Sequence, residues 1–166
     1  MIAVKFLLGI AIVGFTSLCG YFLSNKFRQR KVFFQQFKTF NQHFLNELAY
    51  YKRPLDVFIS THVYKGEFHN FLVEFLHHLK GDSLNVFLSL EDIEYKFLNK
   101  DEKDFIRDYF ITLGKGDGES QKAYFSASKD NLNKICQQTD EICKKYSDLY
   151  IKLGFLFGLL LLILIL

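Results

Sequence analysis

Glycine is densest at residues 114–118, which read Gly-Lys-Gly-Asp-Gly. Loops of this kind cradle phosphate when a G-x-x-x-x-G-K-[ST] motif joins a strand to a helix. Here the order differs and helical sequence is expected on both sides, so no nucleotide site is predicted. Asp117 and Glu119 could bind calcium, but the twelve-residue ligand pattern is absent. The plainer interpretation is a tight turn between helices, in which Asp117 bonds to loop amides.

Histidine and cysteine are the other residue types that could bind a metal or act as a nucleophile. His62 and His69 are seven residues apart across a glycine, and the chain contains neither H-E-x-x-H nor C-x-x-C. Cys136 and Cys143 share one helical face and are expected to be small buried apolar residues. We therefore expect no catalytic residue, no metal site and no cofactor, and a protein that is not an enzyme.

Acidic residues concentrate across two neighbouring stretches of helical sequence, residues 83–98 and 101–113. The cluster consists of Glu91, Asp92, Glu94, Asp101, Glu102 and Asp104. Such a run is usually a solvated face, and the alternative is a docking surface for a basic partner. On that alternative Glu102 and Asp104 are candidate contacts. The net charge of +3 is too small to indicate nucleic-acid binding.

The charged middle of the chain, residues 24–152, has apolar residues at steps of three and four, which predicts helices. The first helix continues from the apolar N-terminus to residue 52, with an inward stripe that ends at Tyr51, and Pro54 stops it. Shorter helices are expected at residues 55–64, 67–80, 83–98 and 101–113, the last capped by Asp101. No strand pattern competes.

The last helix is expected to begin near residue 119 and to run about 48 residues, into the apolar C-terminus. Its predicted inward stripe consists of Leu132, Ile135, Thr139, Ile142, Tyr146, Leu149 and Leu153. The predicted fold is therefore all-α. A bundle of about six helices spans residues 24–150, and its first and last helices continue into the terminal apolar segments.

Those terminal segments predict a protein that crosses the membrane twice. Residues 6–23 contain no charge and would rise about 27 Å as a helix, against a hydrocarbon core of ~30 Å. Residues 153–166 are also uncharged but shorter, and span only with help from residues 146–152. We therefore expect transmembrane segments at residues 1–23 and 151–166, although a cleaved signal peptide and a helix buried in protein remain the respective alternatives.

Basic residues flank the inner ends of both segments, whereas only Lys5 lies outside them. The inner residues are Lys26, Arg28, Arg30, Lys31, Lys38, Lys134, Lys144, Lys145 and Lys152. This asymmetry predicts a cytoplasmic middle domain, with both termini on the opposite face and contact with membrane lipid. Gly154 and Gly158 form a G-x-x-x-G pair, which either joins copies into a homo-oligomer or admits the first segment.

Four stretches resemble stage III sporulation protein AB of endospore-forming bacteria. They are Glu47-Leu-Ala-Tyr50 with Pro54-Leu55; Leu113-Gly114-x-x-Asp117-x-x-Ser120-Gln121; Lys145-Tyr146 leading to Lys152; and the tail from Leu153-Gly154. The sequence departs from the family at Arg53, where a threonine is usual. It departs again after Leu55, where Asp56-Val57-Phe58 replaces the family's Glu-Ala.

The resemblance implies a function, whereas the spacing of residues alone does not indicate one. The family's middle domain is similar to the helical domain of type II secretion F and type IV pilus platform proteins. It implies a non-enzymatic platform in the mother-cell membrane that engulfs the forespore. A hexameric ATPase, stage III sporulation protein AA, would dock on the cytoplasmic domain, and other membrane subunits of the channel would surround it.

Within the resemblance, Gly114, Asp117 and Gln121 are candidate partner-binding residues, alongside Glu102 and Asp104 of the acidic cluster. The plainer interpretation is that the loop residues only shape the turn. A second hypothesis is a small two-pass scaffold or adaptor that is not coupled to an ATPase. A third, an enzyme at the membrane, requires a catalytic constellation that the sequence does not show.

Overall fold

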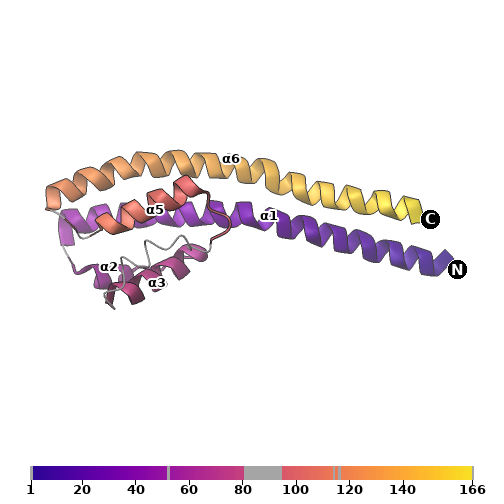
Figure 1. Ribbon diagram of the computed structural model, residues 1–166, viewed down its shortest axis with the longest axis horizontal. Helices are drawn as coiled ribbons and strands as arrows, with labels where there is room; N and C mark the ends of the chain where they lie inside the picture. The colour runs from indigo at the N-terminus through magenta and orange to yellow at the C-terminus, as the bar shows by residue number, and fades with distance from the viewer. Residues whose placement is uncertain (1, 52, 81–94, 114, 116, 166) are drawn as a thin grey trace. The chain divides into compact units, whose positions relative to one another are not determined.

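The computed structural model describes residues 2–51, 53–80, 95–113, 115 and 117–165, and it is all-α (Figure 1). Among these residues are five α-helices and one π-helical turn. They are α1 (Ile2–Asn46), η1 (Glu47–Tyr51), α2 (Leu55–Thr61), α3 (Glu67–Lys80), α5 (Lys100–Thr112) and α6 (Gly118–Ile165). The expected helix at residues 83–98 falls almost wholly outside the described residues. Residues 95–98, its expected end, form a turn instead.

The chain forms two compact units, and α1 and α6 contribute to both. Unit 1 consists of Met1–Arg28 and Thr139–Leu166, and unit 2 consists of Gln29–Gln138. The two long helices each contain a stretch that is long and apolar enough to cross a membrane. This finding fits a membrane protein, as the sequence predicts.

Phenylalanine rings fill the core of unit 2. The stripe of α1 that begins at Phe33 buries its rings completely, and Phe37 stacks on Phe68 of α3 with 5.4 Å between centroids. Phe110 of α5 meets Phe71 of α3 edge to face at 4.7 Å. Each ring removes roughly 150–250 Å² from water, so a small bundle becomes stable with few residues. The spacing of three and four along α1 is what brings these rings to one side.

One polar network crosses this aromatic core. The Tyr109 hydroxyl donates to Asn41 Oδ1 at 2.8 Å, and Asn41 Nδ2 donates to the Phe125 carbonyl at 3.1 Å. All three residues are completely buried. Buried polar groups are stable only when paired, so this chain of bonds sets the register of α1, α5 and α6.

Several helix boundaries agree with the sequence and two differ. The helix at residues 67–80 and the 48-residue final helix are confirmed. The second helix ends at Thr61 rather than Tyr64, since His62 has extended backbone. The helix α5 begins after Asn99, not Asp101, which corrects the expected cap. Asn99 and Glu102 form a reciprocal capping box there, with bonds of 2.8 and 3.0 Å.

The predicted inward stripe of α1 is wrong at its end. Tyr51 is 67% exposed, whereas Glu47 is buried. The cause is the π-helical turn Glu47–Tyr51, whose wider winding rotates later side chains away from the α-helical phase.

The predicted stripe of α6 is also wrong in unit 1. Thr139 is buried as predicted, but Leu149 and Leu153 are exposed, whereas Cys143 and Ser147, which the predicted stripe does not include, are buried. Transmembrane helices pack through small residues and turn their large apolar residues toward lipid, which reverses the rule used for water-soluble helices.

Glycines set the distance between α1 and α6 in unit 1. A Cβ atom added to Gly154 would lie 2.6 Å from the Thr16 carbonyl oxygen, and one added to Gly20 would lie 2.5 Å from that of Tyr150. Gly158 is similarly close to Val13. The Gly154–Gly158 pair therefore admits the first apolar segment of the same chain, which answers the question that the sequence leaves open.

Candidate partner-binding site

An ion pair with a buried carboxylate fixes the turn that follows α1. The Glu47 carboxylate is 3% exposed and accepts from Arg53 Nη2 at 2.6 Å, from Arg53 Nε at 3.0 Å and from the Arg53 backbone N–H at 2.8 Å. The arginine hydrogen bonds hold the pKa of Glu47 below its ordinary value. The Arg53 guanidinium also lies over the Tyr51 ring, 5.0 Å from its centroid. Arg53 is therefore tied back to Glu47, the first residue of η1.

This turn presents two aromatic side chains to solvent. Tyr50 is 79% exposed and Tyr51 is 67% exposed, although both follow directly from a buried helix. Exposed tyrosines on a fixed backbone are typical of contact surfaces, because they add large area at low cost in conformational entropy. A π-helical turn is itself rare and is frequent at functional sites.

The loop before α6 is closed by its own side chains. Asp117 Oδ1 accepts from the Ser120 backbone N–H at 2.9 Å, which caps the helix. Hydrogen bonding to the Ser120 side chain, and then to its backbone N–H, lowers the pKa of Asp117. Gln121 is buried and donates from Nε2 to the Lys115 carbonyl at 3.0 Å. Both residues shape the turn, as the plainer interpretation holds. Asp117 is exposed as well, whereas Gly114 lies outside the described residues.

The turn after α1 and the loop before α6 lie at the same end of unit 2 (Figure 1). Phe44 of α1 meets Phe125 of α6 edge to face at 4.9 Å. Because the helices run antiparallel, one to two further turns bring Tyr51 level with the first residues of α6. We define Tyr50, Tyr51, Asp117 and Glu119 as the tyrosine end of unit 2.

The two acidic candidates lie elsewhere. Glu102 is 5% exposed and accepts from Arg30 of α1 at 2.8 and 3.0 Å, so its charge is used inside unit 2. Asp104 is partly exposed and pairs with Arg107 on the same helix. Both sit in the first turns of α5, whereas the tyrosine end lies beyond its last turn. Of the four described candidates, the structure therefore does not bring Glu102 and Asp104 together with Asp117 and Gln121.

Sequence reasoning missed the two tyrosines. Tyr50 belongs to a resemblance stretch, and Tyr51 falls on a helical stripe that continues the core pattern. The available signal is the position of an aromatic pair just before Arg53 and Pro54, where the helix has to end. A π-helical turn has no sequence pattern that would have shown the rotation.

Two histidines stack beside this turn. The rings of His43 and His62 are 4.3 Å apart, and His43 Nδ1 lies 3.3 Å from the Tyr64 hydroxyl. Burial, and then the neighbouring His62, lower the pKa of His43. In the part of the chain that the structure describes, no three histidine, cysteine or acidic residues gather as metal ligands.

The fold and this site define a class: a small α-helical protein with two helices apolar enough for a membrane, an aromatic bundle and an exposed tyrosine turn. The family model for stage III sporulation protein AB matches residues 5–166. The chain therefore belongs to the stage III sporulation protein AB family, which indicates a role in sporulation. No curated protein and no solved structure matches the chain.

Proposed function

We propose that the protein is a non-enzymatic membrane platform of a sporulation channel, and that the tyrosine end of unit 2 docks a hexameric secretion-type ATPase. The observation that supports this most strongly is the exposure of Tyr50 and Tyr51 on a turn fixed by Glu47 and Arg53. Solvent exposure of two rings has a cost that docking removes. Two of the four resemblance stretches, those that contain Tyr50 and Asp117, also have described residues at this end.

The chemistry of this end suits a mixed surface on the partner. The two tyrosine rings fit apolar pockets, and each hydroxyl keeps a hydrogen bond available. Asp117 directly precedes α6 and Glu119 lies in its first turn, and both carboxylates favour basic groups across the interface. We expect the tyrosines to carry most of the binding free energy, with the two carboxylates steering the approach.

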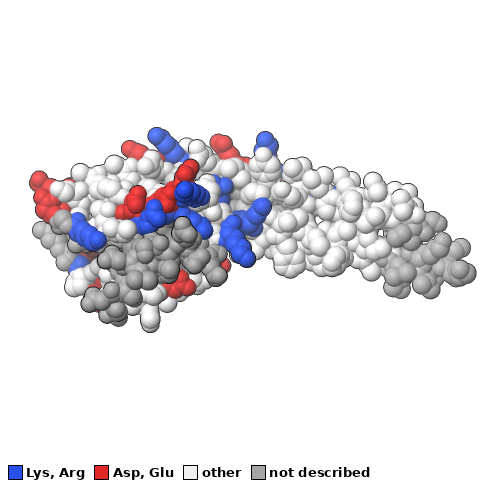
Figure 2. All heavy atoms as spheres, in the orientation of Figure 1, with Lys and Arg blue, Asp and Glu red and all other residues white. Residues whose placement is uncertain are grey.

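Charge supports a topology in which unit 2 faces the cytoplasm. On the face seen in Figure 2, the apolar segments of unit 1 carry neither basic nor acidic side chains, and basic side chains gather where these segments end. Lys26 and Arg28 on α1 and Lys145 on α6 are exposed there. Positive residues remain on the cytoplasmic side of a membrane, so we propose that both termini lie on the opposite face.

The experiment that tests the docking is equilibrium binding between the full chain in nanodiscs and a purified ATPase of the stage III sporulation protein AA type. Tyr50→Ala and Tyr51→Ala should each weaken binding by roughly 5- to 30-fold, as expected for interface hot spots. Asp117→Asn should mainly slow association at low salt. Helix content by circular dichroism checks that each variant remains folded.

The matched control is Val73→Ala, since Val73 is 53% exposed on α3 of the same unit and lies outside the tyrosine end. Its affinity should equal that of the unchanged chain. If all variants bind equally well, the tyrosine end is not the docking surface. If the unchanged chain does not bind the ATPase at all, the platform proposal fails, and the scaffold or adaptor hypothesis takes its place.

A further inference from the structure

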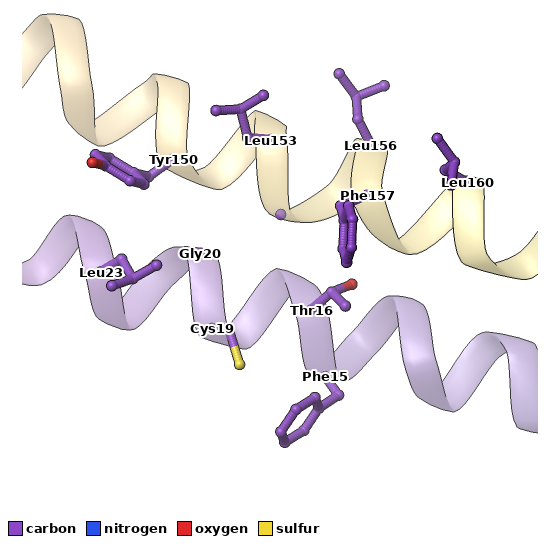
Figure 3. Close-up of a pocket in the computed structure, with 11 residues that line it drawn as sticks. Phe15, Thr16, Cys19, Gly20, Leu23, Tyr150, Leu153, Leu156, Phe157 and Leu160 are labelled. Carbon is purple, nitrogen blue, oxygen red and sulfur yellow. The ribbon is translucent and has the colours of Figure 1, made fainter.

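Unit 1 contains an open apolar groove between its two helices. Its volume is about 580 Å³, within the range of ~300–1,000 Å³ typical of ligand sites. Figure 3 shows Phe157 of α6 pointing toward α1, with Phe15 and Cys19 of α1 and Leu156 of α6 pointing outward as rims. The lining residues are Phe15, Thr16, Cys19, Gly20, Leu23, Tyr150, Leu153, Gly154, Leu156, Phe157 and Leu160.

The groove offers almost no polar group to a ligand. The Thr16 hydroxyl is already bonded within α1, to the carbonyls of Ile12 and Val13 at 3.0 and 3.1 Å. The groove also lies in the segments that are apolar enough for a bilayer. An occupant of this groove must therefore present an apolar surface to it.

Both rims end in a lysine at the same end of the groove. On α1 the rim runs from Phe15 through Cys19 and Leu23, and the next position on that face is Lys26. On α6 the rim runs back from Leu160 through Leu156 to Lys152, in steps of four. Both lysines are exposed. Because the Tyr150 carbonyl lies against Gly20, Lys152 lies near the level of Gly20, roughly 9 Å along the helix axis from Lys26.

An aromatic stack closes the groove at that lysine end. The Phe27 ring stacks on Tyr150, a lining residue, at 5.7 Å and on Tyr146 at 5.6 Å. Lys26 Nζ lies 5.1 Å from the centroid of the Phe27 ring. Aromatic and basic side chains at the end of an apolar segment mark the level of the lipid headgroups. Lys26 and Lys152 therefore lie near the depth at which lipid headgroup phosphates are found.

We propose that this groove binds an anionic phospholipid, with one acyl chain between the rims and the headgroup phosphate at Lys26 and Lys152. An apolar channel with a positive end matches an apolar chain with a negative end. A protein helix would match the rims but would leave the two ammonium groups without a counter-charge. Asp148 lies one turn from Lys152 on α6, so we expect Lys152 to contribute less than Lys26.

The chain contains no tryptophan, so a single one reports on its own surroundings. Leu156→Trp places the reporter on the groove rim, and Leu18→Trp places it at a similar depth on α1, outside the lining. Both leucines are 58% exposed, which makes the pair closely matched. The full chain is reconstituted in vesicles, and quenching by brominated phosphatidylglycerol is compared with quenching by brominated phosphatidylcholine.

In the Leu156→Trp chain, phosphatidylglycerol should outcompete phosphatidylcholine by roughly 5- to 30-fold, the range expected for one or two lysines near an anionic group. In the Leu18→Trp chain the two lipids should quench equally. Adding Lys26→Gln to Leu156→Trp should remove roughly fivefold of the preference. The charge-matched Lys129→Gln, on α6 in unit 2, should leave it unchanged.

Two results would overturn the proposal. Equal quenching by the two lipids in the Leu156→Trp chain, or a preference that Lys26→Gln does not alter, would show that no charged headgroup is held. Protection of the Leu156→Trp reporter from both lipids, while Leu18→Trp is quenched, would show that a protein segment fills the groove. Circular dichroism of each variant confirms that the helices remain formed.

Discussion

The glycine contact between α1 and α6 allows a prediction of opposite sign at two glycines. A Cβ atom on Gly154 would lie 2.6 Å from the Thr16 carbonyl oxygen and 3.2 Å from Gly20 Cα, both on α1. Ordinary contact begins at 3.4 Å, so Gly154→Ala forces the helices of unit 1 apart by about 0.8 Å. A gap of ~0.5–1 Å forfeits a quarter to a half of the dispersion energy along a contact. We expect a cost of about 1–3 kcal/mol, as for other overpacked sites.

Gly14→Ala is the matched control, because no atom lies within 4 Å of a Cβ at Gly14. Both glycines are in helices, and alanine is favoured over glycine there by up to about 1 kcal/mol. Gly14→Ala should therefore leave the helix pair unchanged or slightly more stable. The same chemical change thus has opposite effects, depending only on what faces the glycine.

Cys143 provides the assay, since it is buried on α6 within unit 1. In a chain that carries Cys19→Ser and Cys136→Ala, a thiol reagent reaches Cys143 when the helix pair opens. The expected cost makes labelling of the Gly154→Ala chain roughly 5- to 150-fold faster. Equal labelling rates for Gly154→Ala and Gly14→Ala would refute the close approach of the two helices.

The remaining predictions concern unit 2. Glu102→Ala should cost about 2–4 kcal/mol of unfolding free energy, because it removes the capping box and leaves a partly buried arginine without its carboxylate. Asp104→Ala should cost less than about 0.5 kcal/mol. Denaturant titration of both variants distinguishes the acid that stabilises the fold from the acid that is solvated. The pKa of His43 is lowered in the folded state, so stability is complete above the ordinary value of 6.5 and is lost as the pH falls through it. Thermal melts from pH 7.5 to 5.5 should show this loss, and a slope unchanged by His43→Gln or His62→Gln would assign it to other groups. Tyr109→Phe should cost about 1–2 kcal/mol by breaking the buried network, and a melting temperature equal to that of the unchanged chain would show that the hydroxyl bond contributes nothing.

Helix content and most helix limits could be predicted because they depend on local chemistry. Pro54 excludes its neighbour from helical backbone, Gly66 supplies the positive φ of 63° before α3, and apolar steps of three and four define the faces. The prediction of the residue that caps α5 was wrong by two positions. Asn99 and Asp101 are both good caps by type, and the capping box with Glu102 decides between them.

The candidate site could be predicted only in part. Asp117 and Gln121 lie in a loop that the sequence indicates, and their hydrogen bonds within it are local. A glutamate such as Glu102 is expected on the surface, yet it is buried against Arg30, a residue 72 positions away in the chain. No local pattern records such a partner. The same limit applied to Tyr51, whose exposure depends on a π-helical turn.

The amino-acid sequence by itself determined the all-α class, the two apolar terminal segments and the last helix of 48 residues, because each follows from hydrophobicity and propensity along a short stretch. Tertiary structure alone decided which faces of α1 and α6 meet. In unit 1 glycines face the neighbouring helix and leucines face outward, so the apolar stripe that indicates a core in water points the other way. Tertiary structure also brought the π-helical turn to the same end of unit 2 as the start of α6, since the arrangement of distant segments depends on the packing of the whole unit.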